Sequence, residues 1–157
     1  MDPKAYKDMM QQWPSGVSVV TAIGHGRVPI GLTVSSFTSV SIDPPTVLFC
    51  LDRKNASHDP LLDSGAFAVN VLSADQEDLA RRFAEQPREK RFEDIPLRSE
   101  TTQSPVLEGV LAWLDCGITQ VYPAGDHSIV VGEALAGGSR EGEALLYYRR
   151  GYGRAVT

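Results

Sequence analysis

The sequence predicts a mainly β protein with a few helices, folded as a closed barrel of six or seven strands. The first observation is a series of short apolar segments separated by turns with Gly or Pro, a spacing typical of barrels. The second is the length of 157 residues, which suits one domain over residues 1–157 and is too short for two ordinary domains. The third is an apolar content of 42% and a charged content of 22%, typical of a globular chain.

Strands are expected wherever apolar residues run between turn signals. The clearest case is residues 67–72, where bulky apolar residues alternate with Ala68 and Asn70. Glycine-containing turns at residues 24–27 and 123–126 are expected to join two pairs of strands. In chain order, the expected strands are residues 17–23, 28–34, 46–51, 67–72, 110–122, 128–136 and 144–148.

Three helices are expected beside these strands. Residues 3–12 have apolar side chains at helical spacing, so one face of this helix is apolar. Ser57 is expected to cap a short helix that follows it. Ser73 and Gln76 form a capping box, which opens a third helix ending near Glu85. The long, highly charged segment that follows is expected to be a surface loop, and loops of this length are usually functional.

Charge and hydropathy exclude several classes of protein. The net charge of −5 argues against nucleic-acid binding, which needs an excess of Lys and Arg on one face. No apolar run approaches the roughly 20 residues that cross a bilayer, and the charged N-terminal residues do not indicate a signal peptide. Cys50 and Cys116 each lie in an apolar segment and are expected to be buried thiols. We therefore expect a cytoplasmic protein with neither a nucleic-acid nor a membrane partner.

Motifs for several catalytic classes are missing from the sequence. Gly24-His25-Gly26 begins like a dinucleotide fingerprint, but Pro29 stands where the third glycine is needed, and the segment turns between two strands. The chain has no phosphate loop and no Gly-x-Ser-x-Gly elbow. His25, His58 and His127 lie far apart without paired Cys or His neighbours, so we expect no metal. Any redox chemistry must then come from an organic cofactor.

The most informative stretch is the hydroxyl-rich segment from Gly31 to Ser41, which is followed by Asp43-Pro44-Pro45. Its hydroxyls and free backbone N–H groups, at the end of a strand, can hydrogen-bond a polar ligand without charge. Phe37 adds a flat apolar wall to them. The alternative interpretation is a Ser/Thr-rich loop that only connects two strands.

The segment from Gly31 to Pro45 resembles the signature of the flavin reductase-like proteins, the FMN-binding split β-barrels that serve two-component monooxygenases. Six further segments resemble that family in the same order and extend the resemblance over nearly the whole chain. They are residues 14–21, 67–72, 77–84 with Arg91-Phe92, 105–109, 125–132 and 145–148. The resemblance implies an FMN-binding split β-barrel, with FMN as the cofactor in preference to FAD and with NADH or NADPH as co-substrate.

The resemblance also implies where the flavin binds in this chain. Backbone groups of residues 33–37 and 50–52 would hold the pyrimidine edge of the ring, and hydroxyls of the first stretch can add donors. The phosphate would lie against the turn after the second stretch, where Arg53 and Lys54 bring charge and Ser57 begins a helix. The expected flavin-binding residues are Thr33, Val34, Ser35, Ser36, Phe37, Cys50, Leu51, Asp52, Lys54, Ala56, Ser57, Arg91, Phe92 and Tyr152.

His127 is the catalytic candidate. It lies beside Asp126 in the turn between the two long strands, and the matching histidine of the family faces the nicotinamide side of the flavin. Hydride transfer itself needs no general acid, so the role expected of His127 is to orient NADH or NADPH. The alternative for a single loop histidine is an exposed residue with no catalytic role.

The resemblance implies an NAD(P)H:flavin oxidoreductase that works as a homodimer and supplies reduced flavin to a separate monooxygenase. Two alternatives share the fold: a flavoprotein that keeps its flavin and acts on a small organic substrate, and a non-enzymatic flavin-binding protein. The second gains weight from Gly151-Tyr152-Gly153, which replaces the Arg-Tyr ending usual in the family. The arginine expected near the nicotinamide is then missing or is supplied by Arg149 or Arg150. A further departure is Ser15, where the family usually has Thr.

Overall fold

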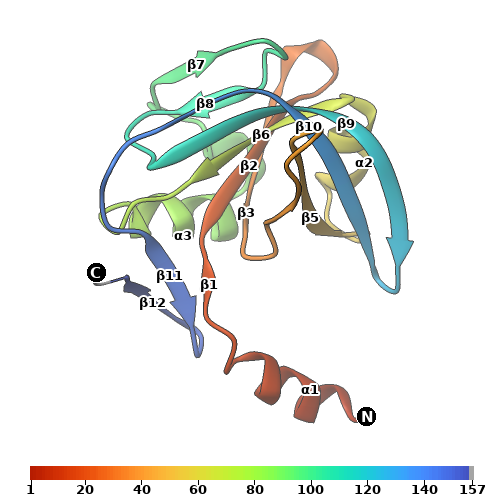
Figure 1. Ribbon diagram of the computed structural model, residues 1–157, viewed down its shortest axis with the longest axis vertical. Coiled ribbons are helices and arrows are strands. Elements are labelled where there is room, and N and C mark those ends of the chain that lie inside the picture. Colours follow the sequence, from red (N-terminus) through yellow and green to blue (C-terminus); the bar gives the residue numbers. More distant parts are fainter. Residues whose placement is uncertain (156–157) are drawn as a thin grey trace.

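The computed structural model describes residues 1–155, so the last two residues of the expected domain lie outside the described part. Within it, the main element is a seven-stranded antiparallel sheet with the strand order β3-β2-β6-β9-β10-β5-β4 (Figure 1). Its strands are β2 (Ser18–Ile23), β3 (Pro29–Val34), β4 (Thr38–Ser41), β5 (Thr46–Asp52), β6 (Ala66–Val71), β9 (Ala112–Ala124) and β10 (His127–Ser139).

The sheet rolls around one apolar core, with β3 and β4 as its two edges. These edge strands follow each other in the chain but are not paired, which is the arrangement of a split barrel. The core inside the barrel is built around Phe49 and Phe67, whose rings meet edge to face with centroids 5.0 Å apart. Gly132 leaves room for this contact, because a Cβ there would lie 2.6 Å from the Phe67 ring. The expectation of a mainly β barrel is confirmed.

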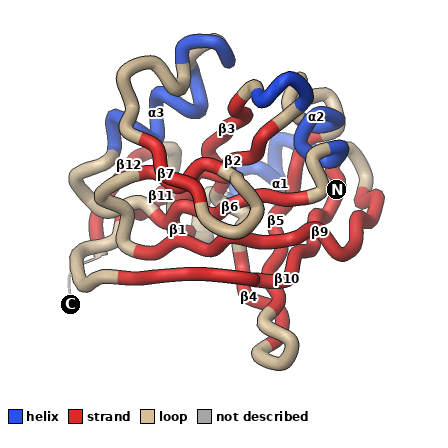
Figure 2. The backbone as a smooth tube through the Cα atoms, turned by 90° about the horizontal axis from the view of Figure 1, so that it is seen from above, coloured by secondary structure: helices blue, strands red, loops and turns tan. Residues whose placement is uncertain are grey.

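The two long strands extend further than expected. Figure 2 shows β9 and β10 running side by side along the molecule. The strand β9 continues through Pro123 and Ala124, which were expected in a turn, and β10 continues to Ser139, beyond its expected end at residue 136. His127 is therefore the first residue of β10 rather than a turn residue, because only Gly125 and Asp126 are needed to reverse the chain.

Two smaller sheets complete the β structure. The first joins β1 (Ser15–Gly16), β11 (Leu145–Tyr148) and β12 (Gly151–Arg154), and the second pairs β7 (Leu97–Ser99) with β8 (Pro105–Leu107). The second overturns the expectation of a simple surface loop after the third helix. Buried polar groups anchor this hairpin: Asn70 Oδ1 accepts from Leu107 N at 2.8 Å, and Asp115 Oδ2 accepts from Thr102 N at 2.7 Å. Such long-range bonds have no local sequence signal.

The three expected helices are present as α1 (Pro3–Met10), α2 (His58–Asp63) and α3 (Glu77–Glu85), with short 3-10 turns η1 (His25–Arg27) and η2 (Arg88–Lys90). Two capping predictions are wrong in detail. The side chain of Ser57 makes no capping bond to α2, and α3 begins after Gln76, one turn later than a capping box at Ser73 requires. The Gln76 side chain does accept from the Ser73 N–H at 3.0 Å, but the Ser73 hydroxyl turns to Asp75.

A second apolar cluster lies outside the barrel, where α3 packs on β2 and β3. Phe83 of α3 is fully buried there, and Phe92 packs against it. No helix among the described residues has the length and apolarity needed to cross a membrane.

Candidate active site

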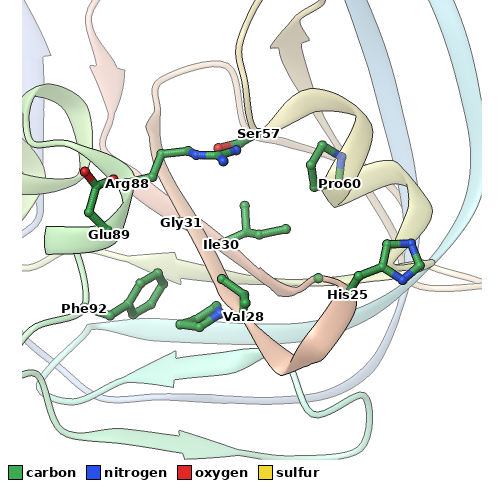
Figure 3. A pocket seen from close by; sticks show the side chains of 11 residues that line it. His25, Val28, Ile30, Gly31, Ser57, Pro60, Arg88, Glu89 and Phe92 are labelled. Carbon is green, nitrogen blue, oxygen red and sulfur yellow. The ribbon is translucent and has the colours of Figure 1, made fainter.

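A cavity of about 490 Å³ opens between the turn after β2, the start of α2 and the segment around η2 (Figure 3). Its apolar wall comes from Val28, Pro29, Ile30, Pro60 and Phe92, and its polar groups are contributed mainly by His25, Ser57, Arg88 and Glu89. A concave apolar site with a few convergent polar groups is the usual form of a cofactor pocket.

Gly31 is required for the wall of this cavity. A Cβ at this position would lie 2.4 Å from the Phe83 ring and 2.7 Å from the Phe92 ring. Without one, Phe92 packs edge to face on Phe83 with ring centroids 5.0 Å apart. Arg91 then ties the same loop to β3, because its Nη1 donates to Gly31 O at 2.7 Å.

Arg91 is a structural clamp in this arrangement. Its Nε also donates to Gln86 O at 2.9 Å, so Nε and Nη1 of the guanidinium are each bonded to a backbone carbonyl. Desolvation lowers the pKa of Arg91, and the neighbouring Arg88 lowers it further. Phe92 lines the cavity, whereas the Arg91 guanidinium is used in bonds to the backbone, one of them to Gly31 of the cavity wall. A flavin contact from Arg91 stays a prediction.

Ser57 has an unusual environment. The residue is fully buried and lines the cavity, yet its hydroxyl has no hydrogen-bond partner among the described residues. Leaving a buried hydroxyl unpaired costs about 1–3 kcal/mol, so such groups need an explanation. Its backbone N–H donates to Asn55 Oδ1 at 2.9 Å, which stabilises the turn before α2. A hydroxyl without a partner, on a residue that lines a cavity, is a candidate to bond a ligand oxygen.

Arg88 stands next to Ser57 and was missed by the sequence reasoning. Its Nη1 donates to Ala56 O at 2.6 Å, which brings the guanidinium to the same end of the cavity (Figure 3). The segment from Arg88 to Glu93 stood out in the sequence only as a charged run, and no local feature separates Arg88 from its neighbours. Lys54 remains exposed, with its N–H donating to Asp52 Oδ1 at 2.8 Å. The positive group at the cavity is thus Arg88.

The end of β3 is joined to β5 by one serine. Ser36 Oγ accepts from Cys50 N at 2.9 Å and donates to Cys50 O at 3.2 Å. The hydroxyl therefore takes the place of the backbone groups of a paired strand. Thr33 Oγ1 donates to Ala80 O of α3 at 2.7 Å. Two of the three hydroxyls expected to face a ligand therefore have partners within the protein. Ser35 is exposed and has no side-chain partner among residues 1–155.

The remaining residues of this strand end divide between core and surface. Val34 and Leu51 are buried in the barrel core and Phe37 packs against it, so only the backbone of the first two can face a ligand. Asp52 is exposed and pairs with His127 across β5 and β10. The structure thus brings residues 33–37 and 50–52 together, but neither stretch lines the cavity beside Ser57.

His127 lies beside this strand end. It pairs with Asp52 between β10 and β5. The next residues in the turn are also linked, because Arg53 N donates to Asp126 O at 3.0 Å. Its ring Nδ1 is 2.7 Å from Asp126 Oδ1, and 43% of its side chain is exposed. The hydrogen bond from His127 lowers the pKa of Asp126, which keeps that carboxylate ionised as the partner of the ring. His127 is therefore oriented and accessible.

Tyr152 lies apart from these residues. Its ring packs on Tyr147 with centroids 5.3 Å apart, and the Arg81 guanidinium lies 4.9 Å from the ring centroid. Burial raises the pKa of the Tyr152 hydroxyl. Arg149, which could have replaced the missing arginine, donates to Gln12 Oε1 at 2.7 Å instead. Within one chain, the structure does not bring Tyr152 or Arg149 to the cavity. Tyr152 lies in β12 and Arg149 lies between β11 and β12, and these strands form a separate small sheet.

Comparisons with known proteins agree on one family. The model of the flavin reductase like domain matches residues 10–155. A flavin reductase of Pseudomonas putida is 42% identical over 154 residues, which cover 98% of this chain and 90% of that protein. The reductase subunit HsaB of a flavin-dependent monooxygenase of Mycobacterium tuberculosis is 36% identical and covers 97% of this chain and 82% of its own. The NADH:FAD oxidoreductase SgcE6 of Streptomyces globisporus superposes with a TM-score of 0.91 at 35% identity, covering 100% of this chain and 97% of its own.

Proposed function

The chain belongs to the family of flavin reductase-like domains, and from this membership we propose how its residues serve the reaction. The protein is an NAD(P)H:flavin oxidoreductase, which transfers a hydride from NADH or NADPH to a flavin. The observation that carries the assignment of the site is the unpaired, buried Ser57 hydroxyl beside Arg88, at one end of an apolar cavity.

The residues present suit a flavin. Ser57 and Arg88 line the same end of the cavity, and we assign the hydroxyl and the guanidinium to a phosphate, since a donor bonded to an anion forms a stronger hydrogen bond than one bonded to a neutral group. Residues 33–37 and 50–52 meet at one strand end, and we assign the pyrimidine edge to the backbone groups there other than those of Cys50, whose N–H and C=O already bond to the Ser36 hydroxyl. When bound, the flavin supplies the ring that accepts the hydride, which no side chain can do.

We assign His127 to the nicotinamide side. The strand pairing to Asp52 holds it at the edge of the same strand end, and Asp126 orients its ring. A half-exposed, oriented imidazole can hydrogen-bond an amide or a phosphate of the nucleotide and hold it in place. Holding two reactants at contact distance is the main contribution a protein makes to hydride transfer, so the role of His127 is positional.

The partner we propose is a flavin-dependent monooxygenase that receives the reduced flavin. HsaB is itself the reductase subunit of such an enzyme. Two other relatives are the reductase subunit of a stachydrine N-demethylase and the reductase component of a flavin-dependent trigonelline monooxygenase.

We also propose a homodimer. The helix α1 has no buried residue, and Tyr6, Met9, Met10 and Trp13 are between 48% and 72% exposed. Figure 1 shows α1 projecting from the rest of the molecule. At the sheet edge, Val40 and Ile42 of the β4 segment are also exposed, Ile42 to 95%. Contiguous exposed apolar side chains mark interaction surfaces, and a second copy of the chain provides the matching apolar surface.

The function is tested by mixing the purified protein with NADH or NADPH and with FMN, FAD or riboflavin in separate reactions. We expect oxidation of the nucleotide in the presence of a flavin, at a rate that depends on the flavin concentration. If neither nucleotide is consumed with any of the three flavins, the proposed reaction is wrong and a flavin-binding protein without reductase activity is the better description.

A further inference from the structure

A chain of three polar side chains lies next to the cavity and outside the residues described above. His58 Nδ1 is 2.6 Å from Asp59 Oδ1, and His58 Nε2 is 2.9 Å from Ser128 Oγ. His58 and Ser128 are 8% and 5% exposed, whereas the Asp59 side chain is 87% exposed. Because the ring is shielded from water, the bond to Ser128 has little competition from solvent.

The Asp59 carboxylate sets the direction of the first bond. An ionised carboxylate only accepts, so Nδ1 of His58 carries a hydrogen and donates to it. His58 Nε2 and the Ser128 hydroxyl, which can both donate and accept, form the second bond. Every polar atom of the His58 ring is satisfied in this way, which explains how a histidine can be buried at this position.

The same three residue types form the triad of serine hydrolases, but the surroundings do not suit catalysis. Ser128 lies in the middle of the sheet, with its backbone paired to Leu51 on one side and to Pro123 on the other. Neither Ser128 nor His58 lines the cavity. A nucleophile must reach its substrate, so this arrangement serves position instead.

The bond joins two elements at a critical point. Among residues 1–155, His58–Ser128 is the one side-chain hydrogen bond between α2 and β10. Ser57 directly precedes His58, and His127 directly precedes Ser128. The two ends of the bond are thus each one residue from a group assigned to the site, one on the phosphate side and one on the nicotinamide side.

We propose that His58 is a positioning residue for hydride transfer, which fixes the His127 side of the site relative to Ser57 through its bond to Ser128. The proposal rests on the function proposed above, since it gives His127 and Ser57 their roles. Removal of the bond loosens the start of β10 against α2, so the nucleotide is held less well while the flavin phosphate keeps its own contacts.

The test compares Ser128→Ala with two controls. Ser128→Thr retains the hydroxyl, and Ser139→Ala changes an exposed serine at the far end of β10. We expect Ser128→Ala to raise the KM for NADH or to slow flavin reduction in stopped flow by about 5- to 10-fold, the loss expected for one hydrogen bond. Flavin affinity should stay within about twofold, and Ser128→Thr and Ser139→Ala should resemble the wild type. His58→Phe, which keeps an aromatic ring without polar atoms, should repeat the effect of Ser128→Ala.

A double-mutant cycle with His127→Ala separates positioning from a general structural role. If Ser128 acts through His127, Ser128→Ala has little further effect in the His127→Ala background, and the two losses are not additive. Additive losses overturn the proposal, as do equal losses of flavin and nucleotide binding or unchanged kinetics in Ser128→Ala. Should Ser128→Ala fold poorly, His58→Phe, which removes the same bond, decides by the same criteria. Wild-type protein that oxidises no nucleotide would instead refute the proposed function itself.

Discussion

Replacement of Ser57 by alanine should have opposite effects on the empty protein and on its complex with FMN. The hydroxyl is buried and has no partner within residues 1–155, so its removal breaks no hydrogen bond in this part of the chain. An unpaired buried hydroxyl costs about 1–3 kcal/mol, and its loss should raise the free energy of unfolding of the flavin-free protein by about 1 kcal/mol. For a chain of this size, that corresponds to a rise in Tm of roughly 2–4 °C.

The complex should be weakened by the same substitution. If Ser57 donates to the flavin phosphate, its loss removes a hydrogen bond to a charged group, worth about 1.5–3 kcal/mol. The dissociation constant for FMN should then rise roughly 10- to 150-fold. Riboflavin has no phosphate, so its affinity should not change. Fluorescence titration of both flavins and thermal unfolding of the flavin-free protein measure the two effects.

Ser64→Ala is the matched control, because it removes a serine hydroxyl from the other end of α2. Ser64 Oγ lies 2.6 Å from Leu61 O and 2.8 Å from Ala66 O and donates its one hydrogen between these carbonyls, so this variant should lower the stability without a specific loss of FMN affinity. A lower Tm for Ser57→Ala, of the size seen with Ser64→Ala, would contradict the unpaired state of the Ser57 hydroxyl. Equal losses of FMN and riboflavin affinity would refute the phosphate site at Ser57.

Three further predictions concern other parts of the molecule. His127→Ala should raise the KM for NADH or NADPH or slow flavin reduction, at a cost of at most a few kcal/mol in transition-state stabilisation, while flavin affinity stays nearly unchanged. Stopped flow and flavin titration measure the two effects. A variant that simply loses flavin would remove His127 from the nicotinamide side. Met9→Glu combined with Trp13→Glu should convert the dimer to a monomer in light scattering, while Lys7→Glu on the same helix should not; a wild-type monomer would refute the dimer. Burial raises the pKa of the Cys116 thiol to about 12, so at pH 8 it stays protonated, and Ellman's reagent should label Cys50 alone until a denaturant exposes Cys116; rapid labelling of both native thiols would contradict this burial.

Local patterns were sufficient to predict most of the elements. The alternation in residues 67–72 and the apolar runs before Gly24 and Ser35 predict β6, β2 and β3, and every predicted end lies within one residue of the observed end. Such patterns depend on the two faces of a strand and on turn residues, which are properties of neighbours in the chain. The short strands β1, β4, β7, β8 and β12 were missed because pairing partners, and not composition, make them strands.

The site divides in the same way. The sequence by itself determined the family, the barrel, the stretches 33–37 and 50–57 as candidates and the interest of His127, because these are properties of residue types and order. Only the tertiary structure decided which groups are free to bind a ligand. Thr33 and Ser36 bond to Ala80 and Cys50, while Ser57 is left unpaired beside Arg88. The availability of a donor depends on the partners that other segments bring to it, and those partners are set by packing and strand register across the whole fold.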